Sequence, residues 1–141
     1  TPRVEIPSKT ATLYGGLGES DFADGSAIRD MVEHLRAGIL PSTTIPNTFI
    51  RQLLGYPSIR YAYDCLRRIG VGPVSVSGAG PSLYALVTSW REAVEIAFRL
   101  PGDVGATTTV RTLPAAVSDQ SAAEAAGVRR MALALRGVSE S

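Results

Sequence analysis

The sequence predicts an α+β domain in which a ferredoxin-like, split βαβ antiparallel sheet carries helices packed on one face. Two observations predict this class. Short β-prone segments with alternating apolar residues are separated by segments whose apolar residues recur at helical spacing, and Gly or Pro punctuates the boundaries between them. The 141 residues, 45% hydrophobic and 19% charged, are sufficient for one hydrophobic core.

The first third of the chain is predicted to contain one strand and two helical segments. Residues 3–6 alternate polar and apolar positions before Pro7, which is typical of a short strand, because proline cannot donate to the ladder. Residues 8–14 indicate a loop with one or two helical turns. Residues 26–35 place apolar side chains three and four positions apart, which predicts an amphipathic helix that Gly38 ends.

A loop, a short helix and a longer helix are predicted next. The proline- and threonine-rich residues 41–46 form the loop. Asn47 is interpreted as the N-cap of a short helix that turns Phe49 and its following apolar residues inward. The helix over residues 57–69 begins with proline, which suits a first turn, and carries a continuous apolar stripe.

The second half is predicted to complete the sheet. Residues 74–76 and 83–87 are strands, and a Ser-x-x-Glu capping box opens a helix over residues 89–100. The β-branched residues 107–113 form a further strand. A last helix is predicted over residues 121–136, and the element order without the extra helices is strand, helix, strand, strand, helix, strand.

These elements suggest residues 1–114 as one domain and residues 115–141 as a C-terminal helical tail. A net charge of +1 with scattered arginines gives no field for a nucleic acid or a membrane, so neither is an expected partner. Cys65 is the single cysteine and is interpreted as a half-buried, inert thiol; no spacing indicates a metal site. With no apolar run of about 20 residues and no leader pattern, we expect a soluble, cytoplasmic protein.

The most specific local feature is the connection between the two central strands, residues 77–82, which we call the glycine loop. Gly78 and Gly80 lack Cβ atoms, so their backbone can approach a ligand closely and expose amide donors, for instance to a phosphate. A tight structural turn explains the same residues, and from the residues alone the structural turn is favoured.

The sequence Ser-Gly-Ala-Gly-Pro within the glycine loop resembles the third conserved motif of the GHMP kinases, a Ser-Gly-Ser-Gly-Pro-like loop between two strands, with Ala79 at the middle serine. The resemblance implies that Gly78, Ala79 and Gly80 contribute backbone to an active-site floor beside nucleotide phosphates and substrate. It also implies that Ser77 or Ser82 donates a hydroxyl.

Three further features resemble the 4-diphosphocytidyl-2-C-methyl-D-erythritol kinase branch. Residues 9–14, Lys-Thr-Ala-Thr-Leu-Tyr, resemble its Ser-Thr-Ala-Glu-Val-Tyr segment; residues 47–49 resemble its Asn-Asp-Phe; and Tyr-Pro at residues 56–57 resembles the start of its Tyr-Pro-Glu-Ile passage. The resemblance implies that Thr10 contacts a substrate hydroxyl and that Tyr14 offers its ring to cytosine, as aromatic rings stack on bases. A core or rim role for Tyr14 is an equal alternative.

By this resemblance the full-length enzyme transfers the ATP γ-phosphate, with Mg²⁺, to the 2-hydroxyl of a cytidine diphosphate derivative in non-mevalonate isoprenoid biosynthesis. The family's ATP loop and its catalytic aspartate and lysine lie in an N-terminal domain, and the Gly-Gly-Leu-Gly at residues 15–18 lacks the serines of that loop. We therefore assign no catalytic residue, metal or cofactor to this chain, and expect it to be inactive without the N-terminal kinase domain.

Two alternatives remain open. The chain belongs to another GHMP kinase, acting on homoserine, mevalonate or a sugar, because the glycine loop does not choose between branches. Alternatively, it is a standalone ferredoxin-like small-molecule-binding module that forms a homodimer through its sheet, since fold likeness alone is weak evidence for function. Binding of cytidine diphosphate separates the first hypothesis from both alternatives.

Overall fold

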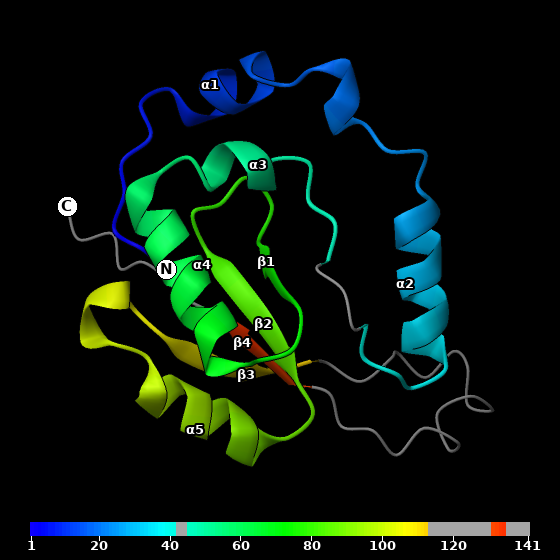
Figure 1. Cartoon of the computed structure of the whole chain (residues 1–141), viewed down its shortest axis with the longest axis vertical. Helices are drawn as coiled ribbons and strands as arrows, with labels where there is room; N and C mark the ends of the chain where they lie inside the picture. The colour runs from blue at the N-terminus through cyan, green and yellow to red at the C-terminus, as the bar shows by residue number, and fades with distance from the viewer. Residues whose placement is uncertain (42–44, 113–130, 135–141) are drawn as a thin grey trace.

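A four-stranded antiparallel sheet forms the centre of the protein (Figure 1). The computed structural model describes residues 1–41, 45–112 and 131–134. The strands lie in the order β1-β2-β4-β3. They comprise β1 (Val74–Val76), β2 (Leu83–Val87), β3 (Thr108–Arg111) and β4 (Met131–Ala134). The α+β class and the antiparallel sheet predicted from the sequence are confirmed.

The helical elements agree with the predicted segments. They are α1 (Lys9–Gly15), α2 (Ser26–Arg36), α3 (Ile50–Leu53), α4 (Pro57–Ile69) and α5 (Trp90–Arg99), with 3₁₀ turns η1 (Glu19–Asp21) and η2 (Gly102–Val104). Helix α4 packs against β1 and β2, whereas α5 packs against β2, β3 and β4. In α5, the Ser89 hydroxyl accepts the Glu92 N–H at 3.2 Å, which confirms the serine half of the predicted capping box. The Glu92 carboxylate accepts the N–H of Thr88, at 3.1 Å, rather than that of Ser89, so the reciprocal half is not formed.

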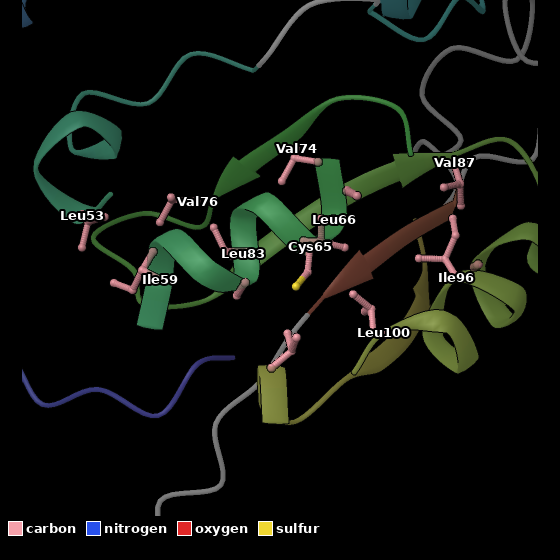
Figure 2. Packing of buried hydrophobic residues seen from close by; sticks show 14 of the residues in the cluster. Leu53, Ile59, Cys65, Leu66, Val74, Val76, Leu83, Val87, Ile96 and Leu100 are labelled. Atoms are coloured by element: carbon pink, nitrogen blue, oxygen red, sulfur yellow. The ribbon is translucent and has the colours of Figure 1, made fainter. Parts of the chain in front are cut away.

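Alternation along β2 explains why both helices cover the same face. Leu83, Ala85 and Val87 are buried, whereas the residues between them are only partly buried. Because successive side chains of a strand point to opposite faces, this buried set faces the helices. Figure 2 shows side chains from α4, α5 and the strands meeting in one cluster. Cys65 lies inside it at 3% exposure, deeper than the half-buried position predicted.

Residues 3–6, which were predicted to form a strand, have no regular secondary structure. Val4 and Ile6 instead pack against the core from an irregular segment, which accounts for their alternation. In the split βαβ plan this first strand would lie between β2 and β3. Strand β4 occupies that place, so β2, α5 and β3 form the split βαβ unit with β4 between its strands.

The predicted last helix is wrong over residues 131–134, which form β4; the rest of that prediction lies outside the described residues. The local sequence Met-Ala-Leu-Ala favours helix by propensity. Pairing with β2 on one side and β3 on the other gives its backbone hydrogen-bond partners on both edges, and this tertiary context overrides the propensity. These residues of the predicted tail therefore belong to the sheet.

Helix α2 has the predicted amphipathic pattern but stands apart from the sheet (Figure 1). None of its residues is buried, and Ile28 and Val32 are 44% and 36% exposed. Its apolar stripe therefore has little cover within the described residues. Across the same residues, every helix is too short or too polar to cross a bilayer.

Candidate functional site at the glycine loop

The glycine loop closes on itself through two backbone hydrogen bonds. The Ser77 N–H donates to the Ser82 carbonyl at 2.8 Å, and the Gly80 N–H donates to the Ser77 carbonyl at 2.9 Å. Gly78 and Gly80 have φ angles of +54° and +66°, in the left-handed region that glycine adopts without a steric penalty. Glycine is therefore favoured over any residue with a Cβ at both positions of this bend.

The loop has one packed side and one open side. A Cβ built on Gly80 would lie 3.0 Å from a methyl carbon of Leu53 and 3.2 Å from one of Val76, whereas a Cβ on Gly78 would meet nothing within 4 Å. On the described part of the chain, the N–H groups of Gly78 and Ala79 donate no hydrogen bond. Successive N–H groups of a turn that have no acceptor in the protein are available to bind an anion.

Helix α1 begins against this loop through Lys9. The Lys9 ammonium donates to the Gly80 carbonyl at 2.6 Å, in a partly buried position. Lys9 is the only lysine in the sequence. It lies at the position of the first serine in the Ser-Thr-Ala-Glu-Val-Tyr segment that residues 9–14 resemble. Sequence reasoning assigned it no site role, because the ammonium-carbonyl contact joins residues 71 positions apart and leaves no local pattern.

Asn47 holds the loop from another direction. Its Nδ2 donates to the carbonyls of Val76 at 2.9 Å and Gly78 at 3.0 Å, while its Oδ1 accepts the Phe49 N–H at 2.8 Å. The N-cap interpretation was wrong, because Phe49 occupies the cap position of α3 and has no side-chain cap bond. Asn47 forms an Asx turn before α3 and uses one amide donor on the last residue of β1 and the other on the glycine loop. In the sequence, only the resemblance of residues 47–49 to the Asn-Asp-Phe segment suggested a role for Asn47 other than capping.

The two predicted substrate contacts lie on α1. Tyr14 is 61% exposed, and its ring meets Phe49 edge-on, with 5.1 Å between the ring centroids and 70° between the ring planes. The buried Leu13 anchors the helix beside it. Tyr14 is therefore a rim aromatic rather than a core residue. Thr10 follows Lys9 and is exposed, and its hydroxyl bonds to no described residue.

The two serines of the loop differ in availability. The Ser82 hydroxyl pairs with the Thr1 hydroxyl at 2.8 Å. The exposed Ser77 hydroxyl has no partner within the described ranges. Of the two predicted hydroxyl donors, Ser77 is the one whose hydroxyl has no partner among the described residues.

A salt bridge fastens the chain between α1 and α2 to α3. The Arg51 guanidinium donates to both Asp21 carboxylate oxygens, at 3.0 and 2.6 Å. These bonds, with a further one from the Gly18 N–H, hold the pKa of Asp21 below its usual range. No group of three or more His, Cys, Asp or Glu side chains gathers as a metal site in the described segments.

A separate pocket of about 610 Å³ lies near η2 and includes none of the predicted site residues. Asp103 and Tyr61 line it, and the Tyr61 hydroxyl donates to the two Asp103 oxygens at 3.1 and 3.3 Å. The Asp103 hydrogen bond is the main cause that raises the pKa of Tyr61 to about 12.

Comparison with known proteins adds one match. Residues 51–106 match the family model described as GHMP kinases C terminal, a segment that runs from α3 through the glycine loop to η2. No curated protein and no solved structure matches the chain. Of the three segments that resemble one branch, residues 9–14 and 47–49 lie outside the matched segment and residues 56–57 lie inside it. The match therefore supports the GHMP kinase superfamily as the family of residues 51–106, without selecting a branch.

Proposed function

We propose that this chain is the substrate-side, C-terminal domain of an ATP-dependent 4-diphosphocytidyl-2-C-methyl-D-erythritol kinase. The observation that carries the proposal is the glycine loop, whose Gly78 and Ala79 N–H groups donate to no described residue and whose Gly78 Cβ position faces open space. Lys9 ties this loop to the start of α1, the helix that carries the other two candidate contacts. The family match to the loop and its flanking elements supports the kinase context.

Each candidate group has a chemical role in this proposal. Diphosphate oxygens accept the two free N–H groups and the Ser77 hydroxyl, because anions are stabilised by several converging donors. The exposed ring of Tyr14 stacks on cytosine, and the Thr10 hydroxyl bonds to a substrate hydroxyl. ATP and Mg²⁺ supply the transferable phosphoryl group and its charge neutralisation in the full-length enzyme. The chain alone is inactive, since the catalytic groups belong to the N-terminal kinase domain.

The partner and the compartment belong to the same proposal. The N-terminal kinase domain covers apolar surface that the described residues leave open, such as the α2 stripe with Ile28 and Val32. A homodimer through this surface is the competing arrangement. A cytoplasmic location follows from the metabolic substrate.

Two other functions compete with this one. Another GHMP kinase, for homoserine, mevalonate or a sugar, would use the same loop for phosphate with no preference for cytosine. A small-molecule-binding module would use a different site, and the 610 Å³ pocket beside Asp103 and Tyr61 is the observation that favours it.

Calorimetric titration with cytidine diphosphate, compared with adenosine diphosphate and inorganic pyrophosphate, tests the proposal. We expect the cytidine nucleotide to bind tightest and Tyr14→Ala to weaken it by about tenfold, because stacking of a base on an aromatic ring contributes about 1–3 kcal/mol. Tyr14→Phe is the matched control and keeps the affinity.

The alternatives give different results in the same titration. Equal binding of both nucleotides and pyrophosphate indicates another GHMP kinase. Absence of binding in the wild type contradicts the proposal.

A further inference from the structure

We propose that Asn47 is a positioning residue that orients the Gly78–Ala79 peptide so that the free Ala79 N–H points to the open side of the glycine loop, where it receives a phosphate-bearing ligand. This inference rests on the proposed function for its ligand. The orientation of the Gly78–Ala79 peptide itself follows from the contacts of Asn47 and does not depend on the ligand.

The orientation of the Asn47 side chain follows from its own contacts. The Phe49 N–H can only donate, so the Asn47 atom that lies 2.8 Å from it must be the oxygen. The nitrogen Nδ2 then faces the carbonyls of Val76 and Gly78 with its two hydrogens. All three polar contacts of the amide are therefore satisfied in one arrangement and not in the flipped one.

The bond to the Gly78 carbonyl fixes more than one atom. A peptide group is planar and trans, so the carbonyl of Gly78 and the N–H of Ala79 point in opposite directions. When Asn47 holds that carbonyl at 3.0 Å, the Ala79 N–H must point away from Asn47. This is consistent with an N–H that has no acceptor among the described residues.

The peptide needs such a restraint because its flanking residue permits other orientations. Gly78 has no Cβ, and nothing lies within 4 Å of where one would be, so rotation about its backbone bonds meets little steric resistance. Reversal of the peptide would turn a carbonyl oxygen toward the ligand and repel an anion. Lys9 completes the restraint at the other end of the loop by holding the Gly80 carbonyl.

Asn47→Asp is the discriminating variant. It keeps an oxygen for the Phe49 N–H, so the Asx turn survives, but it replaces the donor to the Val76 and Gly78 carbonyls with a second acceptor. Thr48→Asp is the matched control, because it places the same charge on the exposed neighbouring residue and leaves Asn47 intact. Both variants are compared with the wild-type 141-residue chain in circular dichroism and amide spectra to verify folding.

Two readouts are measured. The first is the nuclear Overhauser effect between the Gly78 Hα atoms and the Ala79 N–H, which depends on the orientation of their peptide. The second is the affinity for inorganic pyrophosphate and cytidine diphosphate. We expect Asn47→Asp to change the Overhauser intensity and to weaken both ligands at least tenfold, whereas Thr48→Asp leaves the intensity unchanged and weakens them less.

The outcomes are separable. An unchanged Overhauser intensity in Asn47→Asp overturns the inference, and any loss of affinity then reflects charge alone. A changed intensity together with undiminished affinity also overturns it, because the orientation would not serve the ligand. If the wild type binds neither ligand, the proposed function fails, while a changed intensity still supports Asn47 as the residue that orients this peptide.

Discussion

Substitution of the two loop glycines by alanine separates backbone strain from packing. Both glycines have left-handed φ angles, +54° for Gly78 and +66° for Gly80. They differ in surroundings, because a Cβ on Gly78 enters open space and one on Gly80 meets Leu53 and Val76. Gly78→Ala therefore reports the cost of the left-handed backbone, and Gly80→Ala reports that cost plus the cost of overpacking.

The magnitudes follow from these two differences. A side chain in the left-handed region costs about 1–2 kcal/mol, and the lower entropy of an unfolded chain with alanine offsets about 0.4–1 kcal/mol of it. We expect Gly78→Ala to lower the free energy of unfolding by about 1 kcal/mol. Gly80→Ala adds contacts of 3.0 and 3.1 Å with the Leu53 methyl carbons, and overpacking of this kind costs about 1–3 kcal/mol more.

Urea denaturation of the two variants and the wild type measures both costs from shifts in the midpoint at constant slope. Leu53→Ala provides a double-mutant cycle, because Gly80→Ala should cost less in that background than in the wild type, with only the 3.2 Å contact to Val76 remaining. Equal destabilisation by the two glycine variants would contradict the assignment of a packed side at Gly80 and an open side at Gly78. The same holds if Leu53→Ala does not reduce the destabilisation caused by Gly80→Ala.

Three further outcomes are expected. Lys9→Met should speed hydrogen exchange of the two hydrogen-bonded loop amides, those of Ser77 and Gly80, about tenfold, because it removes a charge-assisted bond to the loop of about 1.5 kcal/mol; unchanged exchange would show that the bond does not hold the loop. Ser89→Ala should destabilise the chain by about 1 kcal/mol in thermal denaturation, because the hydroxyl accepts the N–H of the third residue of α5; an unchanged midpoint would contradict this cap. Arg51→Gln should raise the pKa of Asp21 toward its usual value in a carboxyl NMR titration, with Arg60→Gln as the control. Since the folded-state pKa is lowered, this pair stabilises the fold above the ordinary carboxyl pKa and loses its contribution as pH falls through the folded value; identical titration curves would contradict the bridge.

The helices, β1 and β2 were predictable because their patterns are local. Apolar side chains at helical spacing, the proline that opens α4 and the alternation in β2 each report burial on one face. The two errors are the strand predicted at residues 3–6 and the helix predicted where β4 forms. Both concern which segment lies between β2 and β3 in the sheet. That choice depends on pairing between segments far apart in sequence, and neither residues 3–6 nor β4 carries a local signal that decides it.

For the candidate site, the sequence could indicate the glycine loop but not its supports. Glycines in a strand connection are visible in the sequence, and their positive φ angles follow from residue type. The contacts of Asn47 and Lys9 with the carbonyls of Val76 and of the glycine loop span 29 to 71 positions and leave no periodicity. Asparagine before a short helix is more often a cap, so the local rule led to the wrong role.

We propose that the N–H groups of Gly78 and Ala79 donate to a phosphate-bearing ligand. Titration of the ¹⁵N-labelled chain with cytidine diphosphate tests it at those atoms. We expect saturable downfield shifts of these two amide protons, larger than those of amides lining the pocket beside Asp103. Saturable shifts confined to that pocket, or none in the glycine loop, would contradict it.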